Sequence, residues 1–481
     1  MWWWKQNVHS SWLVALASTG FVAGVVVSLI MRLPFAAGIG GICVVIIAII
    51  IGRVYMLPVI ACASVIIGVS YGSVHLGERS GYRYFIGQQV RVSGRIREDP
   101  SKSASGATSL QLDAVSINGM SMPGAVYLSV RSIHDVKRSD RVEAVGDASG
   151  GFGSFPISIT ATSLSRVVRP VSADLGRVVR DWFASKVRTV LPEPGASLGV
   201  GFLTGQKSDL PTELSDSLKV AGLTHIVVAS GYNLTILVQL ARKLFLKASK
   251  FLATMSSSTM IFAFMMVTGL SPSMTRAGLV SAMSLLAWYY GHSFHPIVLL
   301  PVAAALTVAF QPSYVWGDLG WQLSFAAFAG VMILAPLIQS YFFGNTEPSI
   351  IRQIFGETIA AHLVTIPVIA ISFGVISNVA IVANILVVPL VPLAMLLTFL
   401  CGIGASISLP FIQVLATPTS WLLNYMVEVA RFVSEIPWAQ SKLTIPVIGW
   451  GLYGLILVGL CLWMRRATKY NFRTKNVSIP P

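Results

Sequence analysis

Long apolar runs separated by short polar turns dominate the chain, and one block, residues 88–169, departs from this pattern. Three apolar runs come first, at about 11–30, 35–51 and 57–76. Such runs can cross a bilayer core of about 30 Å as helices, because a helix rises about 1.5 Å per residue. With a further helix at Leu223–Ala241, we expect about twelve crossings. The later spans are expected at about 257–270, 273–290, 295–311, 319–340, 356–374, 377–400, 410–434 and 444–464.

The block 88–169 alternates apolar and polar residues, which is typical of half-buried strands. The five expected strands are Val90–Ile96, Leu110–Val115, Ala125–Val130, Arg141–Gly146 and Ile157–Ala161. Five is the strand number of the OB-fold, so we predict a small β-barrel. Arg91, Arg95 and Arg97 alternate along the first strand and therefore share one face. This face is either an external DNA contact or a solvated strand surface.

The pattern divides the chain into five parts. Residues 1–87 form a membrane segment of three spans, and 88–169 form the OB-like domain. Residues 170–194 contain a basic amphipathic helix with Trp182 and Phe183, which is typical of the membrane interface. A second helical membrane domain at 195–464 and a basic tail at 465–481 complete the prediction. The expected fold is thus a mostly α-helical polytopic membrane protein with an inserted extracytoplasmic OB-like barrel.

Composition and charge agree with this fold and set its orientation. The chain has 481 residues, of which 54% are hydrophobic and 11% charged, more apolar surface than a soluble core buries. Arg53 and the basic tail should be cytoplasmic by the positive-inside rule, so three crossings place residues 88–169 outside. No small-residue cleavage site follows the first apolar run, which we therefore expect to be retained. The net charge of +15 leaves room for an anionic partner.

The expected helix Leu223–Ala241 has a fault at Ser230-Gly231, with His225 before it and Asn233 after it. Lipid cannot satisfy the backbone groups that such a fault frees, so it must be buried in protein or line a water-filled cavity. A polar path through the membrane is one interpretation. The other is a small-residue contact where two helices approach closely.

Further polar residues interrupt the apolar runs of the second half. They are Arg276, Asp318, Gln322, Ser324 and Asn384. Charged residues inside spans cost about 2.5–3.5 kcal/mol even on permissive scales, so they usually face a bundle interior or a cavity. The crossing count places four of them in the outer half, where they could line one vestibule: Arg276, Asp318, Gln322 and Asn384. Alternatives are an Arg276–Asp318 ion pair, snorkelling of Arg276, Asp318 at a helix amino terminus, and Asn384 as a helix–helix contact.

Signatures of enzymes are lacking in the sequence. We find no His-x-His-x-Asp-His cluster, no phosphate-binding Gly-x4-Gly-Lys-Ser/Thr loop and no serine nucleophile elbow. All four cysteines, Cys43, Cys62, Cys401 and Cys461, lie in apolar runs without metal-ligand spacing. We therefore expect no enzymatic activity, no metal and no cofactor.

Four motifs in order carry a family resemblance. They are His225-Ile-Val-Val-Ala-Ser-Gly-Tyr-Asn233, Thr275-Arg276-Ala277, Gly320-Trp-Gln-Leu-Ser-Phe325 and Asn384-Ile-Leu-Val-Val-Pro389. Together they resemble the competence domain of ComEC, the channel that brings transforming DNA across the bacterial cytoplasmic membrane. The resemblance covers roughly residues 195–435, and the block 88–169 looks like the external OB-like domain of that family. Many members have a second histidine where this chain has Asn233, so charge switching is not expected there.

The resemblance implies a channel that imports single-stranded DNA during natural transformation. The implied DNA path comprises His225, Ser230, Gly231, Asn233, Arg276, Asp318, Gln322, Ser324 and Asn384. Implied partners are single-stranded DNA, the lipid bilayer, a DNA receptor, a nuclease, and a cytoplasmic motor or single-strand-binding protein. Larger members carry a metallo-β-lactamase-like domain after the last span; none follows here, so we expect the nuclease on another polypeptide. Alternatives are a secondary transporter or lipid-linked substrate flippase, and a membrane-bound hydrolase.

Overall fold

The computed structural model of the chain divides into two compact units. The barrel unit comprises Met1–Asp174 and Pro296–Gln322, and the helical unit comprises Leu175–His295 and Leu323–Pro481. The described residues are 10–51, 56–102, 106–132, 135–169, 174–206, 210–227, 231–291, 296–344, 348–443 and 445–470.

Three helices of the barrel unit pack through small residues. They are α1 (Ser10–Val27), α2 (Phe35–Ile51) and α3 (Leu57–Arg79), and α3 continues into the short η3 (Ser80–Phe85). Gly24 of α1 faces Gly68 of α3 so closely that a Cβ on either would lie 2.1 Å from a backbone oxygen of the other helix. Small residues allow such backbone approach, which is typical of helix pairs in membranes. Two further helices, α11 (Pro296–Phe310) and α12 (Tyr314–Gly317), belong to the same unit.

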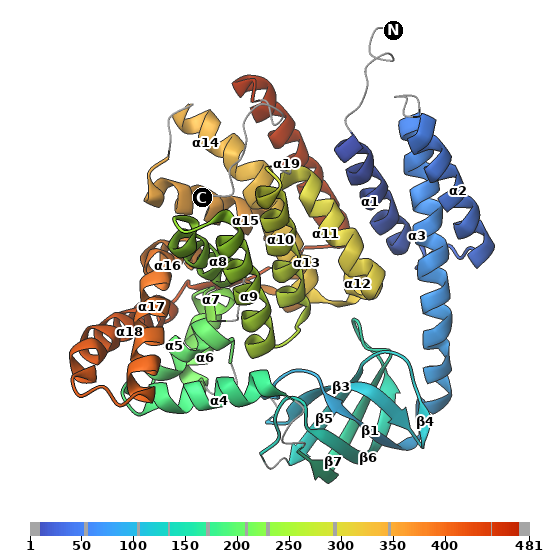
Figure 1. The fold of residues 1–481 in the computed structure, drawn as a ribbon. Coiled ribbons are helices and arrows are strands. Elements are labelled where there is room, and N and C mark those ends of the chain that lie inside the picture. Colours follow the sequence, from blue (N-terminus) through green and yellow to red (C-terminus); the bar gives the residue numbers. More distant parts are fainter. Residues whose placement is uncertain are drawn as a thin grey trace. The chain divides into compact units, whose positions relative to one another are not determined.

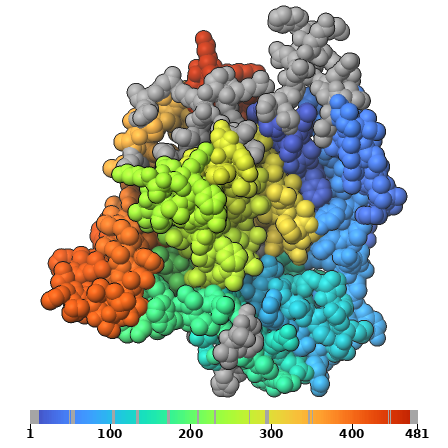
Figure 2. Space-filling model, viewed as in Figure 1, coloured from blue at the N-terminus to red at the C-terminus, as the bar shows by residue number. Residues whose placement is uncertain are grey.

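Five long strands close into a barrel, as the sequence predicted (Figure 1). The five long strands are β1 (Gln89–Ile96), β3 (Thr108–Ile117), β5 (Val126–Ser132), β6 (Arg141–Gly150) and β7 (Ile157–Val168). Two short strands, β2 (Ser101–Lys102) and β4 (Met120–Ser121), pair with β3. The order is β1-β6-β7-β5-β3, and a β1–β3 pairing closes the circle. The β5–β7 pair is parallel, and the other pairings are antiparallel. The space-filling view in Figure 2 draws the barrel in cyan and blue-green.

Alternation explains the barrel core. Val126, Leu128 and Val130 of β5 are fully buried, while the residues between them point outward. Successive side chains of a strand lie on opposite faces, so the sequence pattern directly sets which side is buried. The same rule buries Leu110 and Leu112 of β3.

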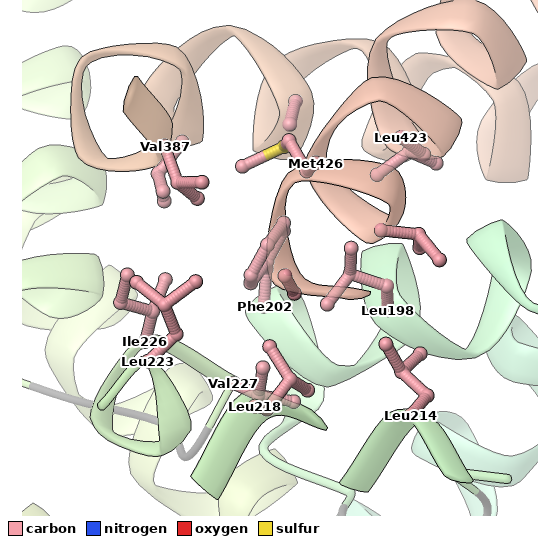
Figure 3. Close-up of a cluster of buried hydrophobic side chains, with 14 of the residues drawn as sticks. Leu198, Phe202, Leu214, Leu218, Leu223, Ile226, Val227, Val387, Leu423 and Met426 are labelled. Atoms are coloured by element: carbon pink, nitrogen blue, oxygen red, sulfur yellow. The ribbon is translucent and has the colours of Figure 1, made fainter. Parts of the chain in front are cut away.

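The helical unit is built around one large apolar core. Leu198 and Phe202 of α5 face Leu423 and Met426 of α18, with Leu218 of α6 beside them (Figure 3). Its elements are α4 (Leu175–Arg188), α5 (Gly195–Thr204), α6 (Thr212–Val220), α7 (Thr224–Val227), α8 (Gly231–Leu246), α9 (Lys250–Thr268), α10 (Pro272–Tyr289), η4 (Gly330–Leu334), α14 (Ala335–Phe343), α15 (Ile350–Phe373), β8 (Val375–Ser377), α16 (Ala380–Val387), η5 (Val388–Leu390), α17 (Val391–Ser406), α18 (Ile412–Ser434), β9 (Gln440–Lys442) and α19 (Val447–Thr468). Helix α13 (Leu319–Ala329) begins in the barrel unit and continues into the helical unit.

Within the described residues, six helices are long and apolar enough to cross a membrane. They are Leu57–Phe85, Lys250–Thr268, Leu319–Phe343, Ile351–Phe373, Ala380–Ser406 and Ile448–Thr468. The expected number of about twelve is therefore not confirmed. Other apolar runs form shorter helices, such as Gly195–Thr204 and Ile297–Phe310, and α18 is too polar along its length to qualify. These helices make the chain a membrane protein.

The expected basic helix is present as α4, and its orientation adds a detail. Val178, Val179 and Trp182 are about half exposed, whereas Arg177 and Arg180 are buried. The apolar face therefore points out of the unit and the arginines point into it. An outward apolar face suits the membrane interface that the sequence predicted.

Candidate functional site

The fault expected at Ser230-Gly231 falls where the description of the chain has a gap. Helix α7 is described as far as Val227 and α8 from Gly231, and residues 228–230, including Ser230, lie outside the described residues. A Cβ on Gly231 would lie 3.3 Å from the Cβ of Ala277, so the start of α8 packs closely on α10. This close approach fits the small-residue contact, one of the two interpretations of the sequence.

Asn233 is fully buried and connects three helices. Its Nδ2 donates to the carbonyl oxygen of Phe202 in α5 at 2.9 Å and, more weakly, to that of Ile226 in α7 at 3.4 Å. Buried backbone carbonyls need such donors, because an unpaired one costs about as much as a lost hydrogen bond. The Asn233 side chain thus stabilises the packing around the fault, a role that the sequence alone did not predict.

A small cavity of about 80 Å³ opens at this fault. His225 and Ile226 from α7 and Tyr232 from α8 line one side, and Val388 and Val391 line the other. The His225 ring is anchored, because its Nδ1 lies 3.0 Å from the carbonyl oxygen of Gly222. The sequence interpretation did not include Tyr232, although it directly follows Gly231.

Asn384 lies in α16, just before the η5 turn that supplies Val388 to the cavity. Its side chain is 8% exposed, and its Oδ1 accepts no hydrogen bond from any residue that the structure describes. Buried acceptors are rarely left without a donor, so this oxygen is available to a hydrogen-bond donor. Asn384 therefore remains a candidate for contact with a transported molecule.

Arg276 is buried in the first turns of α10, with 7% of its surface exposed. Its guanidinium carbon lies 5.1 Å from the centroid of the Phe325 ring in α13, within range of a cation–π contact. Ala277, the next residue, packs against Gly231. Ser324, beside Phe325, is half-buried. The helical unit thus brings Gly231, Arg276 and Phe325 into one region, and a common path through it stays a prediction.

Asp318 and Gln322 belong to the barrel unit. The Asp318 Oδ1 accepts a hydrogen bond of 2.6 Å from the backbone N–H of Trp321, which makes Asp318 the N-cap of α13. The Gln322 Nε2 donates to the carbonyl oxygen of Val315 at 2.9 Å. Asp318 therefore fits the helix-terminus alternative, and a shared vestibule with Arg276 stays a prediction.

The three arginines of the first barrel strand differ in their surroundings. Arg91 is exposed, with its Nε 3.6 Å from Glu143 Oε1, and Arg95 is also exposed. Arg97 instead donates from Nη2 to the hydroxyl of Tyr314 in α12 at 2.7 Å. Burial lowers the pKa of Arg97, but Tyr314 and neighbouring carboxylates raise it, and the net shift is upward. Arg97 therefore anchors the barrel to α12 and is less accessible than the other two.

In the part of the chain that the structure describes, no three histidine, cysteine, aspartate or glutamate side chains lie close enough together to hold a metal ion. The Glu357 carboxylate, inside α15, accepts a hydrogen bond of 2.8 Å from Gln353.

A family model described as "Competence protein" matches residues 202–468. This range includes the fault between α7 and α8, the cavity, Arg276 and Asn384. No curated protein matches the chain, and no solved structure matches it.

Proposed function

The chain belongs to the Competence protein family, whose model matches more than half of its residues, and we propose that it conducts single-stranded DNA across the bacterial cytoplasmic membrane during natural transformation. Membership of this family points to a role in DNA uptake. The observation that supports the finer proposal is the cavity lined by α7 and α8, together with buried Arg276 on α10, the helix that packs against Gly231. Charged side chains buried within membrane-spanning segments usually mark a substrate or ion pathway.

The path residues suit a phosphate backbone. A guanidinium binds phosphate oxygens through several N–H groups and stays charged in a low-dielectric site, where a lysine is more easily deprotonated. Arg276 would hold successive phosphates without reading the bases. The amide of Asn384 would add neutral hydrogen bonds, which release a moving strand more readily than ion pairs do.

In this proposal the barrel lies outside the cytoplasmic membrane and the basic end of α19 lies inside. The barrel receives the strand, and exposed Arg91 and Arg95 contact its phosphates. The chain itself would not be an enzyme, so a nuclease, a DNA receptor, and a cytoplasmic motor or single-strand-binding protein would be separate polypeptides. These partners would supply strand separation and energy.

A clean deletion of the gene tests the proposal. We expect transformation to be lost while labelled DNA still binds the cell surface, and a plasmid copy of the gene should restore uptake. Normal transformation in the deletion strain would reject the proposal. Reconstituted protein that moves a small molecule or lipid, without salt-dependent affinity for single strands, would favour a transporter or flippase instead.

A further inference from the structure

The barrel gathers all three aromatic residues of the block 88–169 into one cluster. Tyr127 lies in β5, and Phe152 and Phe155 lie in the loop between β6 and β7. The ring centroids are 4.8 Å apart for Tyr127 and Phe152, 5.6 Å for Tyr127 and Phe155, and 5.8 Å for the two phenylalanines. In the sequence these residues are scattered and suggest a barrel that is poor in aromatic side chains. The fold concentrates them at one place.

This cluster lies on the outer face of the sheet. Tyr127 points outward, because its neighbours Val126 and Leu128 are fully buried. Its hydroxyl lies 2.5 Å from that of Ser109 in β3, which fixes the ring. Phe152 contacts two other aromatic rings, and yet 52% of its surface is exposed. Phenylalanine is usually buried, so this exposure is unusual.

The strand order of the barrel relates the aromatic cluster to the nucleic-acid-binding face of OB-folds. Among the five long strands, β3 and β5 are the second and third, and the loop 151–156 joins the fourth and the fifth. In OB-folds the face of the second and third strands, with the loop between the last two, is where oligonucleotides bind. The aromatic cluster therefore occupies the nucleic-acid-binding position of the fold, whereas Arg91 and Arg95 lie on the first strand.

A positively charged residue, Arg131, lies on the same face of β5 as Tyr127. Arg131 lies four residues after Tyr127 in β5, so both side chains leave the same side of the sheet, and Arg131 is exposed. At a rise of about 3.3 Å per residue, the two positions are about 13 Å apart. This is within reach of a single strand that stacks a base on the aromatic rings and runs along β5.

The loop that carries the two phenylalanines is held in place. The backbone N–H of Ser154 donates to the carbonyl oxygen of Gly317 at 3.0 Å, and the Arg79 guanidinium donates to the carbonyl oxygen of Ser154. Gly153 adopts a φ of +57°, which favours glycine. A binding surface on an ordered loop loses less conformational entropy when a ligand binds.

We propose that Tyr127, Phe152 and Phe155 form a platform on which bases of single-stranded DNA stack, with Arg131 binding a phosphate of the same strand. The inference rests on the proposed function, since it takes single-stranded DNA as the ligand. Stacking on aromatic rings tolerates any sequence because every base has a π-face. Uptake of DNA of arbitrary sequence needs a contact of this kind.

The test uses the full-length protein in lipid nanodiscs and two fluorescent oligomers of equal length, oligothymidylate and an abasic chain. Both have the same phosphates, and only the first can stack. We expect the wild type to prefer oligothymidylate by at least about fivefold. Phe152→Ala and Phe152→Leu should remove most of this preference and leave affinity for the abasic chain unchanged, which also shows that both variants are folded.

Two further variants sharpen the result. Arg131→Ala should weaken binding of both oligomers and lower the log–log salt slope by about 0.7. Val145→Ala, at an exposed apolar position of β6, is the matched control and should change neither. Equal affinity of the wild type for both oligomers, or a preference that survives both Phe152 variants, overturns the platform. Absence of binding to either oligomer also overturns it, and the deletion strain then decides the proposed function separately.

Discussion

Asn233 is the position where the sequence and the structure suggest different roles, and replacing it with alanine separates them. The substitution removes the amide that donates to the carbonyl oxygens of Phe202 and Ile226. Both acceptors would be left in a buried region, where lipid and protein offer no replacement donor. We therefore expect Asn233→Ala to destabilise the helical unit and not only to alter DNA passage.

The geometry sets the size of this effect. An unsatisfied buried acceptor costs about 1–3 kcal/mol. The 2.9 Å bond to Phe202 should contribute near the middle of that range, and the 3.4 Å bond to Ile226 near its lower end. The sum is about 2–4 kcal/mol. For a unit of this size, the expected fall in the melting temperature is about 2 °C per kcal/mol.

Thermal unfolding of the purified full-length protein in detergent, followed by tryptophan fluorescence, measures this change. Asn424→Ala is the matched control, because Asn424 is exposed and its amide is 3.5 Å from the Ser420 hydroxyl. Exposed substitutions of this kind usually change stability by less than about 0.5 kcal/mol. If Asn233→Ala melts with the control and the wild type but abolishes uptake, Asn233 acts in the DNA path and the structural reasoning is refuted.

Five other substitutions, at four positions, have definite expectations. Arg276→Ala should block transformation, while an immunoblot should show that the protein is still in the membrane. Arg276→Lys should recover part of the transformation because it keeps the charge. Full uptake with the alanine variant would show that Arg276 is not in the path. Gly317→Ala would place a Cβ 2.2 Å from the backbone of Gly153. We therefore expect the melting assay to show a loss of about 1–3 kcal/mol in the free energy of unfolding. Unchanged stability would contradict the close contact. Arg91→Ala and Arg95→Ala should each lower the log–log salt slope of single-strand binding by about 0.7, and an unaltered slope would show that the first strand does not touch phosphates.

The sequence by itself determined the elements that depend on local periodicity. The strands of the barrel follow from alternation, since burial of Val126, Leu128 and Val130 requires only that successive side chains point to opposite faces. The fault near Gly231 was equally readable, because glycine and serine interrupt an apolar run. The ordered motifs also identified the family before any contact was known.

The tertiary structure decided which residues meet. Asn233 bonds to Phe202, thirty-one positions earlier, and Arg97 bonds to Tyr314, two hundred and seventeen positions later. The aromatic cluster of Tyr127 and Phe152 likewise depends on how distant segments of the barrel come together. The expected number of about twelve crossings is not confirmed: six of the described helices are long and apolar enough to cross a membrane. Periodicity fixes the face of a residue locally, whereas its partner depends on apolar burial between segments that are far apart in the chain.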